Sequence, residues 1–169
     1  QQCSEGYFRT YLTTDKTAVD QTCDGGKAAS ASDPSTDTTA LAVITLSQHS
    51  KTPAVSAALA KAKGWLAAAQ AVDGSWGGGA GTSTANSNST GLATRALTGT
   101  ASAKRGVAWL TARQATANDG ALAGEAGAIA YDDTALAAAR TAGIADDTAR
   151  DQWRRATAQA TLGLSAQTP

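Results

Sequence analysis

Apolar residues recur along much of the chain at the spacing of a single helix face. Between residues 54 and 70 they lie three or four positions apart, at Val55, Leu59, Ala62, Leu66 and Ala69. Side chains at this spacing line one side of an α-helix, so the pattern predicts an amphipathic helix from about Ala54 to Gln70. The spacing returns near residues 103–114 and 149–160. The sequence therefore predicts an all-α chain.

Three tryptophans divide the chain at a constant interval. Trp65, Trp109 and Trp153 are separated by 44 residues in each case, a length typical of two-helix repeats. One helix pair cannot bury its apolar face alone, so neighbouring pairs must stack. We expect three units and a final linker or tail at residues of about 1–70, 71–114, 115–164 and 165–169.

A second motif begins with an aspartate or asparagine, continues with hydroxyl residues and ends in an apolar run. It starts at Asp37, Asn88 and Asp132. Side chains of these types accept hydrogen bonds from the free N–H groups of a first helical turn. We therefore expect these three residues to be helix N-caps.

A glutamine followed by an acidic residue and a glycine marks the turns between helices. The clearest copy runs from Gln70 through Asp73 and Gly74 to Trp76, and the bulky residue corresponding to Trp76 is Phe8 or Leu122 in the other copies. Glycine after a helix end suits a backbone with positive φ. The residues that we expect to hold the repeat together are Gln2, Gln70, Gly74, Trp76, Gln114 and Gly120.

The run Lys63-Gly64-Trp65-Leu66, followed by Gln70, Gly74 and Trp76, resembles the QW repeat of squalene-hopene cyclases and related terpene cyclases. The resemblance implies an α/α toroid, in which the glutamine caps helix ends and the tryptophan stacks against it. The chain offers about three helix pairs, so the implied structure is a partial ring. Its alanine- and threonine-rich composition is similar to that of secreted actinobacterial proteins with prenyltransferase-type repeats.

Composition and cysteine placement narrow the class of partners and the location. The formal net charge is zero and charged residues make up 17% of the chain, so we expect no nucleic-acid partner. No apolar run approaches the roughly 18–20 residues that span a bilayer. Cys3 and Cys23 lie in one polar, irregular stretch, which favours a disulfide over two buried free thiols and an extracellular or cell-wall location.

Candidate catalytic residues lie at the last of the three cap motifs. Class II cyclases protonate a double bond with the middle aspartate of an Asp-x-Asp-Asp motif, and the resemblance makes Asp132 the proton donor and Asp133 its neighbour. Ala130 replaces the first aspartate, and the equivalent motifs elsewhere in the chain suit helix caps, so we favour capping over catalysis. His49 has no neighbours at metal-ligand spacing, so we expect no metal and no cofactor.

Aromatic residues anchor many ligands and partners when they are exposed. The candidates for such a surface are Tyr7, Phe8, Tyr11, Trp76 and Tyr131, although packing inside its own turn is the favoured alternative for each. Our leading hypothesis is a non-catalytic secreted or cell-surface module. It would bind a small hydrophobic ligand, or assemble with itself or with another chain that completes the ring. The alternatives are a fragment of a class II terpene-cyclase-like enzyme with Asp132 as proton donor and a purely structural unit.

Overall fold

The computed structural model describes residues 1–12, 15–26, 33–49 and 52–165, and within these ranges every regular element is a helix. This confirms the all-α prediction. The elements are α1 (Thr36–Leu46), α2 (Pro53–Ala68), α3 (Ser87–Ala96), α4 (Ala101–Thr111), the 3₁₀-helix η2 (Gly120–Glu125), α5 (Asp133–Ala142) and α6 (Asp147–Ser165). None of the helices in these ranges is both long enough and apolar enough to cross a bilayer.

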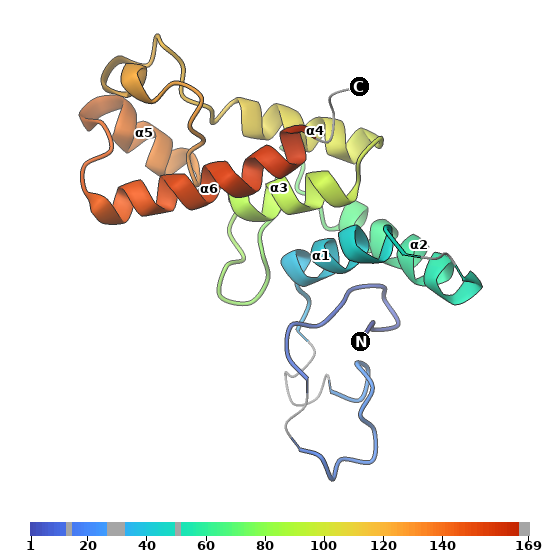
Figure 1. Cartoon of the computed structure of the whole chain (residues 1–169). Helices are drawn as coiled ribbons and strands as arrows, with labels where there is room; N and C mark the ends of the chain where they lie inside the picture. The colour runs from blue at the N-terminus through green and yellow to red at the C-terminus, as the bar shows by residue number, and fades with distance from the viewer. Residues whose placement is uncertain (13–14, 27–32, 50–51, 166–169) are drawn as a thin grey trace.

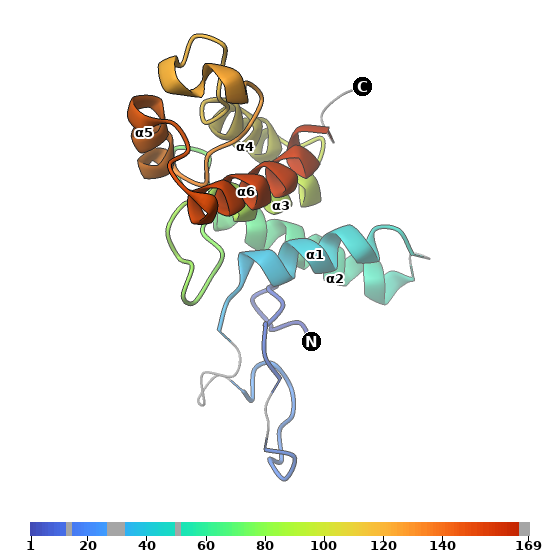
Figure 2. The same ribbon diagram turned by 60° about the vertical axis from the view of Figure 1, so that its left-hand side comes forward.

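Three helices lie side by side and run in the same direction, namely α1, α3 and α6 (Figure 1). We call them the parallel row. Helices α2 and α4 run in the opposite direction, and each packs on the row helix that precedes it in the chain (Figures 1 and 2). Residues before α1 form a loop-rich extension beneath the row (Figure 1). The described chain is therefore a row of parallel helices covered in part by antiparallel ones.

Two of the three expected helix caps are wrong by two residues. The side chain of Ser35 caps α1 by accepting from the N–H of Thr38, and that of Asn86 caps α3 by accepting from the N–H of Ser89. Asp37 and Asn88 lie inside the first turns of these helices. The expected cap at Asp132 is confirmed, because its carboxylate accepts from the N–H of Ala135 at 2.8 Å. Ser and Asn are as good at this position as Asp, so composition alone left the choice open.

Helices α3 and α6 approach each other through glycine. A Cβ atom on Gly91 would lie 2.4 Å from the carbonyl oxygen of Gln159, and one on Gly163 would lie 2.8 Å from the carbonyl oxygen of Gly91. Backbone at such distances leaves no room for a side chain, so only glycine permits this crossing. The crossing fixes α6 against α3 along the row.

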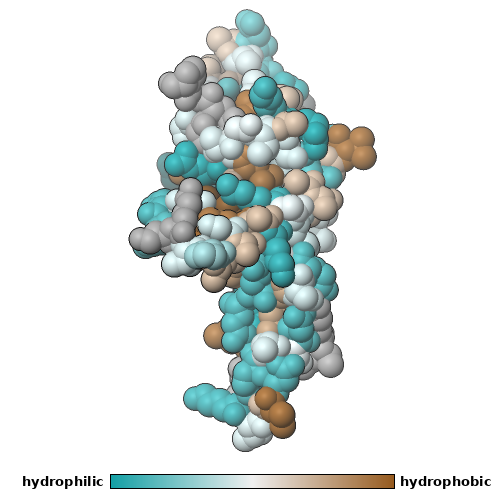
Figure 3. Space-filling model, turned by 90° about the vertical axis from the view of Figure 1, so that its right-hand side faces the viewer, coloured by the Kyte–Doolittle hydropathy of each residue, from teal (hydrophilic) through white to brown (hydrophobic). Residues whose placement is uncertain are grey.

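Small residues dominate the main core, as the composition suggests. A buried cluster joins α1, α2, α3 and α4, and its members are Ala40, Val43, Leu59, Ala62, Leu66, Trp76, Leu92, Ala93, Ala96, Leu97 and Ala103. Alanine lets helix backbones come close, and Trp76 fills the space between them with one large ring. Outside the core, apolar and polar residues are interspersed over the surface, as Figure 3 shows for one face.

The disulfide expected from the sequence is present. Cys3 and Cys23 are bonded, with Cα atoms 4.8 Å apart, and both are buried against Tyr7 and Trp65. The bond closes a loop of the extension, and the buried cysteines pack beside Trp65 of α2. In the chain-entropy model a loop of about 20 residues contributes about 3 kcal/mol.

Replacing Gly91 with alanine tests the α3–α6 crossing. We expect Gly91→Ala to lower the free energy of unfolding by about 1–3 kcal/mol, because the helices must separate to admit the methyl group. Gly64→Ala is the matched control, since a Cβ there would meet nothing within 4 Å, and it should raise stability by up to about 1 kcal/mol. Urea unfolding followed by circular dichroism gives both values. Equal stability changes in the two variants would contradict the close crossing.

Candidate functional site

Turn 1, residues 2–8, is held to α2 by the side chain of Gln2. Its Nε2 donates to the carbonyl oxygens of Gly6 at 2.8 Å and Ala58 at 2.9 Å. Gly6 is buried with φ of 112°, and a Cβ there would lie 2.6 Å from the carbonyl oxygen of Lys61. Turn and helix thus touch backbone to backbone, and the glutamine uses both of its amide hydrogens.

Turn 2, residues 70–76, repeats these contacts against α4. Nε2 of Gln70 donates to the carbonyl oxygens of Gly74 and Ser102, each at 2.9 Å. Gly74 is buried with φ of 95°, and a Cβ there would lie 2.7 Å from the carbonyl oxygen of Arg105. Arg105 also donates through its guanidinium to Oε1 of Gln70. The expected structural roles of Gln2, Gln70 and Gly74 therefore have a common geometry.

The last residue of each turn binds the parallel row. The N–H of Phe8 donates to Oγ1 of Thr39 at 2.9 Å, and the N–H of Trp76 donates to Oγ1 of Thr90 at 3.0 Å. Both threonines are buried at the fourth position of their helix. The indole N–H of Trp76 donates to the carbonyl oxygen of Leu66 at 2.8 Å. Trp76 therefore joins α2 to α3, which is a packing role.

Turn 3, residues 114–129, repeats the contact within the turn and the contact with the row, and it contains an insertion of nine residues. Nε2 of Gln114 donates to the carbonyl oxygen of Gly127 at 3.0 Å. The N–H of Ile129 donates to Oγ1 of Thr157 at 2.8 Å. Gly127 has φ of 97°, close to the values at the other two turn glycines. The inserted residues carry η2.

The expectation that Gly120 and Leu122 complete the third turn is wrong, because Gly127 and Ile129 hold those positions. Leu122 is fully buried, but in a separate cluster with Trp153. The sequence Asp119-Gly120 imitates the motif and conceals the insertion. The spacing of Gly127 to Ile129 is that of Gly74 to Trp76, but Gly120 and Leu122 have it too, so the spacing did not distinguish the two positions.

A second set of backbone bonds gives the same register. The N–H of Thr36 donates to the carbonyl oxygen of Gly78 at 2.9 Å, and that of Ser87 donates to the carbonyl oxygen of Tyr131 at 2.8 Å. Thr36 and Ser87 are the first residues of α1 and α3, and the two acceptors each lie two residues beyond the end of a turn. The residues just after turns 2 and 3 thus each satisfy an N–H group at the N-terminus of the previous row helix.

Helix α6 belongs to the parallel row, although its tryptophan keeps the interval of the α2 and α4 tryptophans. Thr157 lies seven residues farther from the start of its helix than Thr39 and Thr90 do from theirs. Seven residues are close to two full helical turns, so the hydroxyl points the same way. Trp153 is therefore not the counterpart of Trp65 and Trp109, and α6 extends two turns beyond the other row helices.

Both ends of the row are exposed where their counterparts are buried. Leu41 on α1 is 51% exposed, whereas Leu92, at the same position of α3, is 7% exposed beside α1. At the other end Ala158 of α6 is exposed, although its counterpart on α1, Ala40, is fully buried. Leu162 of α6 is also 46% exposed. Each end helix thus presents a face that a further row helix would cover.

No helix among the described residues covers the glycine of turn 3, because α5 packs on the inserted η2 instead. Gly127 is exposed, whereas Gly6 and Gly74 are buried, and a Cβ on Gly127 would meet nothing within 4 Å. Beside it lies a cavity of about 480 Å³. Its lining comes from turn 3, α6 and the segment before α6, and includes Ala126, Ala128, Trp153, Thr157 and Ala158.

The two candidate catalytic aspartates have structural contacts. Asp132 caps α5, as described above. The carboxylate of Asp133 accepts from Nη2 of Arg113 at 2.6 Å, and the guanidinium of Arg113 also lies over the ring of Trp109. The favoured role of Asp132 as a helix cap thus matches its contacts, and Asp133 ties α5 to the end of α4.

The expected aromatic surface is mostly interior. Trp76 is 1% exposed and Tyr7 is 4% exposed, and Tyr7 lies against Trp65 with ring centroids 5.5 Å apart. Phe8 packs against the main core, and Tyr131 is half-buried. Only Tyr11 of the five is largely exposed, at 72%. The five residues therefore do not form one ligand surface.

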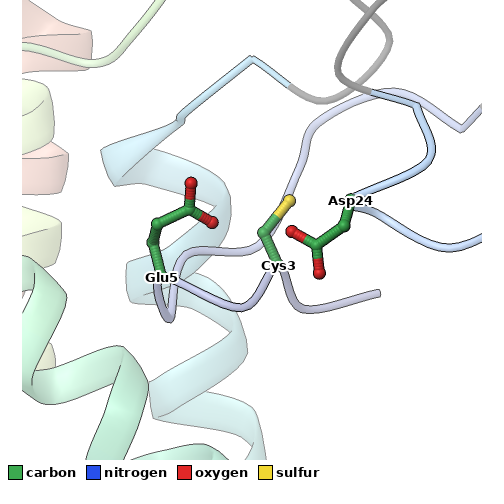
Figure 4. A group of neighbouring side chains, drawn as sticks. All are labelled: Cys3, Glu5 and Asp24. Atoms are coloured by element: carbon green, nitrogen blue, oxygen red, sulfur yellow. The ribbon is translucent and has the colours of Figure 1, made fainter.

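Cys3, Glu5 and Asp24 lie near one another in the extension (Figure 4), with ligand-type atoms within 4.8 Å. The sulfur of Cys3 belongs to the disulfide, so it offers no thiolate. Asp24 accepts from the backbone N–H and the hydroxyl of Ser4. The other two residues, Glu5 and Asp24, offer exposed carboxylates, and two carboxylates alone are too few ligands to indicate a metal site.

The carboxyl of Asp37 has a raised pKa. Burial raises it, and a hydrogen bond from the hydroxyl of Ser89 opposes the shift. Its Oδ1 is buried without a hydrogen-bond partner among the described residues, and so is Oδ1 of Asn88. The two residues occupy the same position, two beyond the caps of α1 and α3. Position 37 therefore disfavours a charge.

Comparisons with known proteins identify no relative of this chain. No family model, no curated protein and no solved structure matches the chain.

Removing the glutamine amide should cost more at turn 2 than at turn 3. Gln70→Leu removes the donor from two carbonyl oxygens at a buried junction, and we expect a loss of about 2 kcal/mol or more in unfolding free energy. Gln114→Leu removes one bond at an exposed position, with an expected loss of about 1 kcal/mol or less. Chemical denaturation measures both. A larger loss for Gln114→Leu than for Gln70→Leu would contradict the observation that no helix covers turn 3.

Asp37→Asn should stabilise the protein near neutral pH. The raised pKa of Asp37 means that folding disfavours the charged form, so wild-type stability falls as pH rises through the folded pKa. The advantage of the variant should shrink as pH falls through the folded pKa, and should be lost below a pH of about 3.9, where the unfolded carboxyl is also protonated. Thermal unfolding from pH 3 to 7 tests this, with exposed Asp33→Asn as control. A pH-independent difference between variant and wild type would argue against a buried charge.

Proposed function

We propose that the chain is a non-catalytic secreted or cell-surface module of α/α helix pairs, arranged as part of a toroid, whose function is assembly. The recurring contacts of the three turns support the helix-pair organisation. The parallel direction of α1, α3 and α6 supports a curved row with α2 and α4 outside it. The disulfide supports an oxidising compartment.

One observation carries the assembly proposal. The row ends in two helices whose outward faces are exposed at positions that are buried inside the row, at Leu41 on α1 and at Ala158 on α6. In stacked helix pairs, an end helix without a polar cap leaves apolar surface that another unit can cover. The two ends are different faces of the same row, so head-to-tail packing of copies would cover both and continue the row.

The contacts of Asp132 and Asp133 do not favour the cyclase alternative. A catalytic acid must hold its proton ready for the substrate, whereas Asp132 accepts a hydrogen bond as a helix cap and Asp133 pairs with Arg113. We therefore do not propose proton donation by Asp132.

Light scattering over a range of protein concentrations tests the assembly. We expect a discrete oligomer of the 16.8 kDa chain for the wild type. Leu41→Glu and Leu162→Glu should each shift it to monomer, because each places a charge in the proposed interface. Val72→Glu, at a fully exposed position of turn 2, should leave the oligomer intact.

Two results would overturn the proposal. One is a wild-type mass equal to the monomer at every concentration. The other is an oligomer that survives both leucine substitutions. Circular dichroism of each variant shows that the fold is retained, since both leucines are on the surface.

A further inference from the structure

We propose that turn 3 and the adjacent cavity form a seat for a helix of another polypeptide. This helix offers a backbone carbonyl oxygen to the amide of Gln114 and a tryptophan side chain to the cavity. The inference rests on the proposed helix-pair organisation. It concerns the surface beside turn 3, which shares Ala158 with the α6 end of the row but does not include Leu41 or Leu162.

Turns 1 and 2, which are each covered by a helix, show what kind of helix turn 3 could bind. At turns 1 and 2 the glutamine amide donates both to the turn and to a helix carbonyl, that of Ala58 or Ser102. At turn 3 the recorded bond of Nε2 of Gln114 is to the turn alone. An amide with a second hydrogen at an exposed site is well placed to bind a helix carbonyl.

Gly127 provides the second element of the seat. At Gly6 and Gly74 the absent side chain lets a helix backbone approach within the reach of a Cβ atom. Gly127 keeps the same positive φ, yet nothing lies within 4 Å of the corresponding position. No atom of the described structure lies close enough to exclude a side chain at Gly127. The space beside it is therefore open to the backbone of another helix.

The cavity accounts for the tryptophan. In α2 and α4 a tryptophan follows the bonded carbonyl by seven residues, two helical turns, at Trp65 and Trp109. Trp65 packs against Tyr7 with the two rings tilted, and the indole N–H of Trp109 donates to Asp73 at 3.1 Å. These partners flank the glycine of their turn on either side.

The residues that flank Gly127 are small. Ala126 and Ala128 stand where the other turns have Asp73 and Tyr7, and both line the cavity of about 480 Å³. Trp153 and Ala158 of α6 line it as well. The lining also contains the charged residues Glu125, Arg150 and Arg154, so apolar side chains occupy only part of it. The tryptophan of the seated helix would pack against that apolar part. A helix with small residues around its bonded carbonyl, and with a tryptophan two helical turns after that carbonyl, fits this site.

A synthetic peptide of residues 100–114, labelled with fluorescein and acetylated, is the probe, because it carries Ser102, Arg105 and Trp109 at the required spacing. Fluorescence anisotropy with the whole chain should show saturable binding. The same peptide with Trp109→Ala should bind at least tenfold more weakly. Gly127→Ala in the protein should weaken the wild-type peptide by a similar factor, because its methyl group occupies the approach path.

Gly81→Ala is the matched control for the protein. Gly81 also has positive φ, of 80°, and open space at the Cβ position, so the variant carries similar backbone strain far from the seat. It should bind the peptide like the wild type. Equal binding of the two peptides would overturn the assignment of the cavity to tryptophan, and absence of binding would overturn the seat. Neither result bears on the leucine variants, so the assembly proposal is decided separately.

Discussion

At turns 1 and 2 a single side-chain amide that bridges two backbone carbonyls holds the turn to the helix beside it. Helix carbonyls near a crossing and carbonyls of a tight turn are both costly to bury without a donor. Gln2 and Gln70 satisfy one of each. The glycine four residues later allows the backbones to approach closely enough for one amide to span them. This contact positions α2 against turn 1 and α4 against turn 2.

The turns also determine which helices form the parallel row. Each turn ends in a backbone N–H that donates to a threonine hydroxyl of a row helix, and for turn 3 that threonine is Thr157. This bond and the glycine crossing with Gly91 place α6 beside α3, in the direction of α1 and α3. The nine-residue insertion in turn 3 and helix α5 are accommodated outside the row. The same local contacts therefore tolerate large changes in the connecting chain.

Equivalent positions of the repeated elements differ in whether a neighbouring helix covers them. Leu92 is buried and Leu41 is not, and Gly74 is covered by a helix while Gly127 is open. An exposed leucine alone carries little information, because exposed apolar atoms are common on proteins. It becomes informative when its counterpart in the same fold is covered. Both proposals thus concern surfaces that are built like internal contacts but lack their partners.

Local patterns were enough to predict helices, the cysteine pair and the importance of Gln2, Gln70 and Gly74, because these depend on periodicity and on short motifs. The sequence could not separate Gly120 from Gly127, since both follow Gln114 within one loop and Asp119 completes a false motif. Only the hydrogen bond from Gln114 to Gly127 decided between them. Likewise the 44-residue interval assigned Trp153 to the outer helices, whereas packing placed α6 in the row. Periodicity records which face of a helix is apolar, but the neighbour that covers this face is decided by contacts between distant segments.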